Sequence, residues 1–242
     1  MGGLVNAVTY SGGNEFNGQM FGFFTNNDFS RSALRTELEP SRGAYSQYDI
    51  GLSLGGPIVR DRLWFFAAYN TINQNENVMV PGLREYEDRQ LGSVWAGKLS
   101  WRPSSRADIV LTVIGDPSRH TVVGSSLLNV TAASALNPDP MLSRVSQGGF
   151  NFIASANVVA GRTLFLEASL AHTIRRNRTE PATTRGGEEL FFIDYYSGGV
   201  VSGGNYGKAS GDTRQTTASL KGTLVLGGHL FKAGIEYRDN QL

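Results

Sequence analysis

The chain has 242 residues with 22 Lys and Arg against 21 Asp and Glu, so its net charge of +1 gives no global field that would favour nucleic acid as a partner. The absence of cysteine excludes disulfides, thiolate metal sites and cysteine nucleophiles. No run of about 18 apolar residues occurs, which excludes a transmembrane helix but leaves a transmembrane barrel open, because half of each barrel strand faces water.

Stretches of about ten residues that alternate apolar and polar side chains follow one another along the chain, as half-buried β-strands do. The alternation is clearest near the C-terminus, where Phe231, Ile235 and Tyr237 share one face and Lys232 and Glu236 share the other. The strands predicted in this way are Phe16–Thr25, Gln47–Gly56, Arg62–Asn73, Arg89–Arg102, Arg106–Gly115, Ser146–Val159, Thr163–Arg175, Thr213–Leu226 and His229–Asp239.

The connections between these strands are short and long in strict turn. The short ones are Pro57–Asp61, Pro103–Ser105, Ala160–Arg162 and Gly227–Gly228, and the long ones are Asn26–Ser46, Gln74–Asp88, Asp116–Val145 and Arg176–Asp212. The pair Gly227–Gly228 tolerates the positive φ of a tight hairpin. Greek-key sandwiches mix connection lengths, so the alternation predicts an all-β, antiparallel up-and-down transmembrane β-barrel with short periplasmic turns and long extracellular loops.

The apolar faces of the predicted strands are expected to meet lipid, and their opposite faces a wet lumen. The apolar stripes are Tyr48, Ile50, Leu52 and Leu54; Leu91, Trp95, Leu99 and Trp101; Phe150, Phe152, Ala154, Ala156 and Val158; Leu164, Leu166, Ala168, Leu170 and Ile174. The aromatic residues expected at the headgroup level are Trp64, Phe65, Tyr69, Trp101 and Tyr237. Strands 16–25 and 62–73 are apolar on both faces, which suits either an object packed inside the barrel or a plain two-sided core.

Two blocks of sequence resemble a known family. Residues 2–12 (GGLVNAVTYSG) followed by 14–18 (NEFNG) resemble the junction between plug and barrel in TonB-dependent outer-membrane transporters, especially the Oar-like branch. Residues 51–69 (GLSLGGPIVRDRLWFFAAY) are similar to that branch's second strand, first periplasmic turn and third strand. From about residue 74 onward the resemblance rests on strand rhythm alone.

The resemblance implies that residues 1–10 are the last strand of a plug domain and that residues 11–242 are the N-terminal part of the barrel. Large barrels of this kind close with about 22 strands, and unpaired strand edges cannot face hydrocarbon. Because only nine strands are predicted, we expect the chain to be a fragment of a longer protein in the bacterial outer membrane.

By the same resemblance, the whole protein takes up a nutrient such as a siderophore, an oligosaccharide or a peptide, using energy relayed by TonB. The implied partners are outer-membrane lipid or lipopolysaccharide, the TonB complex through the N-terminal part, and an unknown extracellular ligand, with no nucleic acid. We expect no enzyme activity, and no catalytic, cofactor or metal residues; substrate-binding residues stay unassigned. The groups expected to line a polar passage are Lys98, Glu167, Lys221 and Glu236.

Several other features have two readings each. His120, His172 and His229 lack the paired spacing of a metal site. Residues 190–196, after Glu188 and Glu189, either contact a ligand or, as we favour, form a hairpin that extends the barrel wall. Asp116 with Asp139 could form a calcium site, but we favour solvated turns. Arg175, Arg176 and Arg178 could contact lipopolysaccharide, but ordinary solubilising charge is the default interpretation.

Two other classes of protein remain open at this point. A small non-energised porin or adhesin-type barrel would have the same strand rhythm. A soluble β-rich binding module would have it too, and would pack the apolar stripes on a second sheet. An enzyme is the least supported class, because no nucleophile elbow, phosphate-binding loop or zinc-protease motif occurs.

Overall fold

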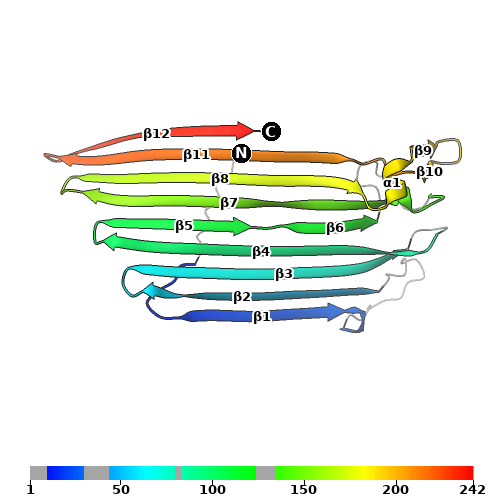
Figure 1. The fold of residues 1–242 in the computed structure, drawn as a ribbon, viewed down its shortest axis with the longest axis horizontal. Coiled ribbons are helices and arrows are strands. Elements are labelled where there is room, and N and C mark those ends of the chain that lie inside the picture. The colour runs from blue at the N-terminus through cyan, green and yellow to red at the C-terminus, as the bar shows by residue number, and fades with distance from the viewer. Residues whose placement is uncertain (1–9, 30–43, 80–82, 124–134, 242) are drawn as a thin grey trace.

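The computed structural model describes residues 10–29, 44–79, 83–123 and 135–241. Its main feature is one antiparallel sheet whose strands lie side by side in chain order (Figure 1). The strands of this sheet are β1 (Asn17–Asn26), β2 (Tyr45–Val59), β3 (Leu63–Met79), β4 (Glu85–Ser104), β5 (Ala107–Gly115), β6 (Ser118–Val123), β7 (Leu142–Ala160), β8 (Leu164–Pro181), β11 (Ala209–Leu226) and β12 (His229–Gln241).

The remaining elements lie at one rim of the sheet, where the long connections are (Figure 1). Among the described residues they are α1 (Thr184–Glu188), the short strands β9 (Phe191–Asp194) and β10 (Val200–Gly203), and the 3-10 helices Asn27–Phe29 and Asp139–Met141. Within the described residues, each helix is too short and too polar to cross a membrane. The β9–β10 pair forms a separate two-stranded sheet.

All nine predicted strands are confirmed, and the sheet has a tenth member because one strand is interrupted. β5 and β6 lie end to end, and both pair with β4 and β7 (Figure 1). The register continues across the break, since Gly115 faces Trp95 and Ser118 faces Gly92. The prediction that residues 116–145 form one loop is therefore wrong for residues 118–123.

The interruption is caused by Pro117 and repaired by its neighbour. Ser93 N–H donates to the Pro117 carbonyl at 2.9 Å, and proline has no N–H with which to return the bond. On the other side, Gly149 N–H donates to the Asp116 carboxylate at 2.6 Å, and Asp116 N–H donates to the Gly149 carbonyl at 3.2 Å. Prolines normally end central strands, which is why the sequence pattern stops at Gly115.

The short connections are tight turns, as predicted. Gly227 and Gly228 have φ of 54° and 86°, the two consecutive positive values of a type I′ hairpin, so the expectation for this pair is confirmed. Asp61, between β2 and β3, has φ of 61°, and it is the one non-glycine residue with positive φ in the described part of the chain. Because these connections are so short, little of the chain extends beyond the strands at this rim of the sheet.

At the other rim the strands run further than predicted. β3 continues to Met79 and β4 begins at Glu85, with these two residues paired, so the long loop predicted for residues 74–88 is wrong. Asn75 and Glu76 show the reason, because here both faces of β3 are polar and the alternation disappears while the backbone pairing continues. The residues that extend β7, β8 and β11 toward this rim are also largely polar.

The registers place all the predicted apolar stripes on one face of the sheet, called here the apolar face; the other is called the polar face. Leu52, Tyr69 and Trp95 face one another across β2, β3 and β4, and Leu170 faces Ala154 across β8 and β7. A one-residue slip in any pair would turn a whole stripe to the other side. The consistency of the registers over nine strands confirms the predicted pattern of faces.

The described residues place no second layer over the apolar face. Leu52, Leu220 and Ile235 on this face are 52%, 50% and 72% exposed. The compact buried core lies instead among the long connections and consists of Ala135, Met141 and Val201. The soluble module with two packed sheets is therefore not the arrangement of the described residues, and an apolar surface of this size indicates a lipid environment.

The boundary of the apolar face shows how the strands tilt. Toward the long connections, the face ends at Leu91 on β4 and at Tyr237 on β12, where charged residues follow. Followed from strand to strand through the registers, the residue on β11 that is level with Leu91 is Ser210. The residue on β11 that is level with Tyr237 is Ala218, so the boundary shifts by eight residues along β11. Eight residues of about 3.3 Å over five strand spacings of about 4.8 Å give a tilt of roughly 45°, close to that of outer-membrane barrel strands.

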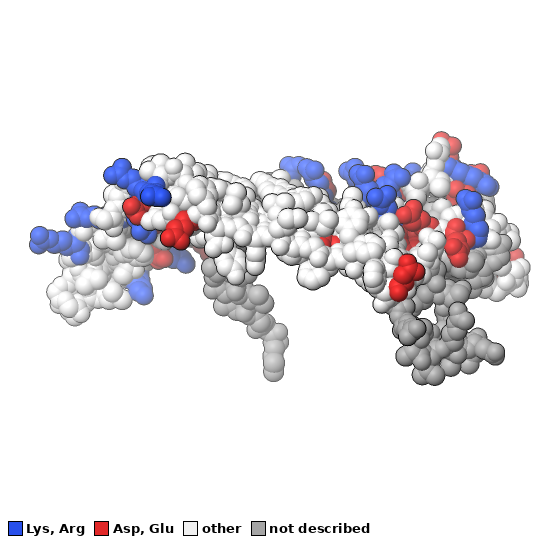
Figure 2. All heavy atoms as spheres, turned by 90° about the horizontal axis from the view of Figure 1, so that it is seen from below, with Lys and Arg blue, Asp and Glu red and all other residues white. Residues whose placement is uncertain are grey.

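Charged and aromatic residues border the apolar band. Seen from the β1 edge, Lys, Arg, Asp and Glu gather toward the two ends of the strands and leave the middle largely uncharged (Figure 2). Four of the predicted headgroup-level residues, Phe65, Tyr69, Trp101 and Tyr237, lie on the apolar face. The fifth assignment is wrong, because Trp64 lies on the polar face, where its Nε1 donates to the Asn14 side chain at 2.8 Å.

The assignment of faces predicts opposite outcomes for two adjacent residues at the centre of β7. In the intact protein, Ala154→Arg places a charge on the apolar face and should destabilise membrane assembly by about 2–4 kcal/mol. Ser155→Arg, a matched change on the polar face, should leave assembly nearly unchanged. Folded protein in outer-membrane fractions, measured by heat-modifiable gel mobility, checks both, and equal losses would contradict the assignment.

Candidate functional site

The polar face carries the charged groups expected to line a passage. Lys98, Glu167, Lys221 and Glu236 all lie on this face, as predicted. Lys221 is directly opposite Glu167 on β8, and the last three of the four border one open hollow. Their sharing of one face is confirmed, whereas their role in a passage stays a prediction.

One end of the polar face is aromatic and is covered by the segment that leads into β1. The ring centroids of Tyr10 and Phe66 are 6.2 Å apart. A Cβ on Gly12 would collide with the Phe65 carbonyl oxygen, so only glycine permits this close approach to the β3 backbone. Strand 62–73 is apolar on both faces, and this contact favours the interpretation that another part of the chain packs against it inside the barrel. The predicted plug strand, residues 1–10, lies outside the described residues except for Tyr10.

Asn14 ties this entry segment to the first tight turn. Its side-chain oxygen accepts from Asp61 N–H at 2.9 Å and from Trp64 Nε1 at 2.8 Å, and its Nδ2 donates to the Asp61 carboxylate at 2.5 Å. Nearby, Phe16 lies so close over Gly56 that a Cβ there would collide with the ring. The two blocks that carry the family resemblance therefore meet in space at this junction.

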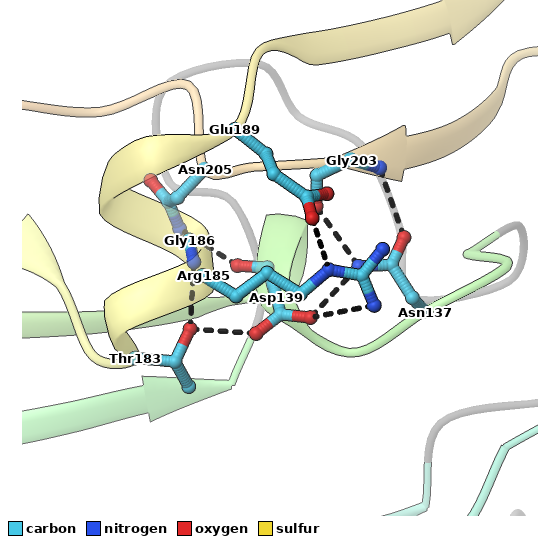
Figure 3. Close-up of polar contacts among 8 residues, drawn as sticks. All are labelled: Asn137, Asp139, Thr183, Arg185, Gly186, Glu189, Gly203 and Asn205. Atoms are coloured by element: carbon cyan, nitrogen blue, oxygen red, sulfur yellow. Dashed lines mark hydrogen bonds and ion pairs between the residues drawn. The ribbon is translucent and has the colours of Figure 1, made fainter.

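A polar cluster, called here the loop cluster, holds the long connections together; Figure 3 shows its residues Asn137, Asp139, Thr183, Arg185, Gly186, Glu189, Gly203 and Asn205. Asp139, 6% exposed, is at its centre, and its carboxylate accepts from Thr183 Oγ1 at 2.6 Å and from Asn137 Nδ2 at 2.8 Å. Arg185 lies 3.9 Å from the same carboxylate and donates from Nε to Glu189 at 2.7 Å. Thr183 also caps α1 by accepting from Gly186 N–H at 2.9 Å.

Two asparagines link this cluster to the β9–β10 hairpin. Asn137 makes a reciprocal pair of 2.9 Å bonds with the backbone of Gly203 (Figure 3). Asn205 Nδ2 lies 3.0 Å from both the Leu142 carbonyl and Ser143 Oγ, and its Oδ1 accepts from Gly207 N–H at 2.8 Å. Residues more than sixty positions apart are thereby fixed in one rigid unit.

The charge of Asp139 contributes to the stability of this unit. Burial raises the pKa of Asp139, but the bonds from Thr183 and Asn137 and the nearby Arg185 outweigh it and hold the pKa below its ordinary 3.8. A carboxyl group with a lowered folded-state pKa stabilises the fold above its unfolded-state pKa, and the contribution is lost as pH falls through the folded value.

The β9–β10 hairpin presents aromatic side chains at its tip. Tyr195 and Tyr196 are 79% and fully exposed, and Phe192 on β9 is 57% exposed. The Asp194 carboxylate orders the tip by accepting from Tyr196 N–H at 2.9 Å and Ser197 Oγ at 2.6 Å. The predicted segment, residues 190–196, does belong to a hairpin, as its first strand, while the second strand is at Val200–Gly203. The prediction that the hairpin extends the wall is wrong, because it forms a sheet of its own.

The calcium and solvated-turn readings of two aspartates are both replaced. Asp116 repairs the β5–β6 break, and Asp139 is buried in the loop cluster, so the structure does not bring them together. In the described part of the chain, no group of three or more His, Asp or Glu side chains is placed to hold a metal ion.

The histidines and the basic cluster are dispersed. His120 bonds Asp88 at 2.5 Å and His172 bonds Thr216 at 2.9 Å, whereas His229 lies at the β11–β12 turn. Arg176 and Arg178 lie on the apolar face, and Arg175 lies on the polar face. The three arginines therefore do not form a single patch.

Sequence reasoning missed the residues that organise the loop cluster. Asn137 and Asp139 stand in an Asn-Pro-Asp-Pro stretch, which signals a turn but not burial. Thr183, before Thr-Arg-Gly-Gly, is a recognisable helix cap. Asn205 has no local signal, because all its partners are either distant in sequence or set by the loop fold.

Comparison with known proteins gives two matches. Residues 8–165 match the family described as "Outer membrane beta barrel domain". A "TonB-dependent transporter Oar" from Myxococcus xanthus is 41% identical over 73 residues, which are 28% of this chain and 7% of that protein. The chain therefore spans only a small part of the length of this relative.

Asn205→Ala should loosen the loop cluster while the sheet stays intact. Removing the side chain leaves several buried partners without their bonds, a loss of about 1–3 kcal/mol. Hydrogen exchange in the intact protein should show faster exchange in α1, β9 and β10 and unchanged exchange in β7 and β8. Asn177→Ala, on β8 outside the cluster, is the control; equal effects of the two changes would contradict this role.

The loop cluster should also open in acid. Because the pKa of Asp139 is lowered, its contribution should persist from neutral pH to about pH 4 and fall below that. Hydrogen exchange of α1 and β10 measured from pH 7 to pH 3, corrected for intrinsic rates, checks this. Asp139→Asn cannot titrate and should exchange faster at pH 7 but lose this acid step; a step of the same size in both proteins would refute the assignment.

Proposed function

The chain belongs to the outer membrane beta barrel domain family and lies in the bacterial outer membrane, and from this premise we propose that its sheet is part of the barrel wall of an Oar-like, TonB-dependent transporter. The whole protein takes up a scarce nutrient, a siderophore, an oligosaccharide or a peptide, with energy relayed by TonB. The wall contributes no covalent chemistry. It supplies a polar inner face and presents loops to the outside.

The observation that carries this proposal is the 41% identity with a TonB-dependent transporter. It is supported by the junction at Asn14, which joins both blocks of the resemblance. The packing of Tyr10 and Gly12 on the polar face is what a chain emerging from inside a barrel would show. Residues 1–10 as the end of a plug and residues 11–242 as barrel wall fit this path.

The orientation follows from the two rims. Outer-membrane barrels have short periplasmic turns and longer extracellular loops. The tight turns at Asp61 and Gly227–Gly228 then face the periplasm, and the loop cluster around Asp139 faces outward. The exposed rings of Phe192, Tyr195 and Tyr196 are in this orientation the groups we assign to contact with an extracellular ligand, since aromatic rings supply much contact area at low entropic cost.

A non-energised porin or adhesin-type barrel is the second candidate. The observation in its favour is that a polar face with alternating charge, such as Lys221 opposite Glu167, is also what an open diffusion channel needs. It predicts passive flux that needs no energy.

Loss of the gene for the intact protein should abolish concentrative uptake of at least one of the three nutrient classes, and loss of TonB should abolish the same uptake. Accumulation of labelled siderophores, oligosaccharides and peptides, with and without a protonophore, measures this. Uptake that depends on the protein but tolerates both the protonophore and TonB loss would favour the porin.

Single cysteines test the orientation, because this part of the protein contains none. On intact cells, a membrane-impermeant maleimide should label Tyr196→Cys on the hairpin tip and should label Ser105→Cys in the β4–β5 turn only after the outer membrane is permeabilised. The reverse pattern would place the long loops in the periplasm.

A further inference from the structure

The apolar face is hollowed at the long-loop rim, across β4, β6, β7 and β8. The groove has a volume of about 1040 Å³. Leu91, Phe150 and Ile174 border it with apolar side chains. Four arginines also border it, on the side of the loops: Arg119, Arg144, Arg176 and Arg178.

The break between β5 and β6 produces this hollow. Ser93, Pro117 and Gly148, whose side chains are compact or absent, lie between the row of Phe150 and the row of Arg119 and Arg178. Gly148 has φ of +134°, and a Cβ there would lie 2.6 Å from the Asp116 carbonyl oxygen. The backbones approach too closely for a side chain, so the floor of the groove stays open.

The groove has a net positive charge, because only part of the arginine charge is offset: Glu180 is opposite Arg144 and Asp212 is opposite Arg176. Glu180 and Asp212 are its only acidic lining residues among those the structure describes, against four arginines. Arg178 pairs weakly with Glu180 at 3.8 Å. No carboxylate forms an ion pair with the other three arginines in the described part of the chain.

The position of these arginines is unusual for solubilising charge. Arg119 and Arg178 share one row of the apolar face with Ser146 between them, and like charges on one face of a sheet repel each other. Along their strands the four arginines stand two to six residues beyond the last row of the apolar band, the row of Phe150 and Ile174, on the side that faces lipid. A bound anion would remove the repulsion, and arginine forks match phosphate oxygens well.

We propose that this groove binds the phosphorylated headgroup of a glycolipid of the outer leaflet, with arginines on the phosphates and acyl chains on Leu91, Phe150 and Ile174. The inference rests on the orientation in the proposed function, which puts this rim at the outer leaflet. A free phosphate would not use the apolar border. A protein partner would have to displace the lipid that covers the neighbouring apolar band.

The test compares neighbours on β8 that point to opposite faces. The intact protein, extracted from outer membranes in mild detergent, carries Arg176→Gln, its control Arg175→Gln, or the triple change Arg119→Gln, Arg144→Gln and Arg176→Gln. Co-purified phosphorylated glycolipid per protein is measured by mass spectrometry. We expect a loss of about threefold for the first and about tenfold for the triple variant, since exposed charge pairs contribute modestly, and no loss for Arg175→Gln.

A second measurement distinguishes recognition of the phosphate from contact between acyl chains and the apolar side chains. Delipidated protein is titrated with the bisphosphorylated glycolipid, its dephosphorylated form and a zwitterionic phospholipid; only the first should bind in an arginine-dependent way. Equal lipid content in all variants, an equal fall with Arg175→Gln, or equal binding of the dephosphorylated form would each overturn the proposal.

The proposal and the transport function can fail separately. Periplasmic labelling of Tyr196→Cys would remove the orientation and with it this site. Uptake that proves independent of TonB would leave the lipid result standing, because the groove is on the outside of the wall. Assembly of each variant is checked by heat-modifiable mobility, so that a misfolded protein is not taken for a loss of binding.

Discussion

Backbone hydrogen bonding in a medium without water is the constraint from which the rest of this structure follows. In hydrocarbon every N–H and C=O must be paired within the protein, and the sheet pairs them strand by strand from β1 to β12. In the described part of the chain, β1 and β12 pair on one side only. Their outer sides require partners in the membrane, and a closed barrel wall is the arrangement that provides them.

The same constraint explains why the break in the sheet is repaired rather than left open. Pro117 removes one donor near the boundary of the apolar band, and the Asp116 carboxylate accepts the bond from Gly149 that a backbone carbonyl would normally accept. The repair brings two backbones together and excludes a side chain at Gly148. A local defect in pairing thus becomes a hollow in the outer surface, at the depth where lipid headgroups begin.

The sequence predicts the membrane-spanning part of this fold well, because there one face is apolar and the other polar. That contrast gives each strand a two-residue period, and the period alone places Leu52 and Leu170 on one side and Lys221 on the other. Beyond the apolar band both faces are wet, as at Asn75 and Glu76, so the strands continue without a signal.

The loop cluster could not be predicted for a different reason. Its stability depends on pairs that the chain brings together from far apart, such as Asn205 with Leu142 and Asn137 with Gly203. Nothing near Asn205 in the sequence distinguishes it from an asparagine in a solvated turn. Burial of Asp139 follows from the same long-range folding, and its Asn-Pro-Asp-Pro setting indicates only a change of direction.

The junction at Asn14 lies wholly within the family match, whereas the loop cluster lies only partly within it. The junction of Asn14, Asp61 and Trp64 joins the entry segment to the first tight turn, and close backbone approach at Gly12 and Gly56 leaves little freedom in residue type. The family match begins near this junction, at residue 8, and ends at residue 165, so it includes Asn137 and Asp139 but not the β9–β10 hairpin. Loops are in general freer to diverge than the scaffold that carries them, and the part of the loop cluster that lies beyond the match includes residues of α1 and of the β9–β10 hairpin, and Asn205.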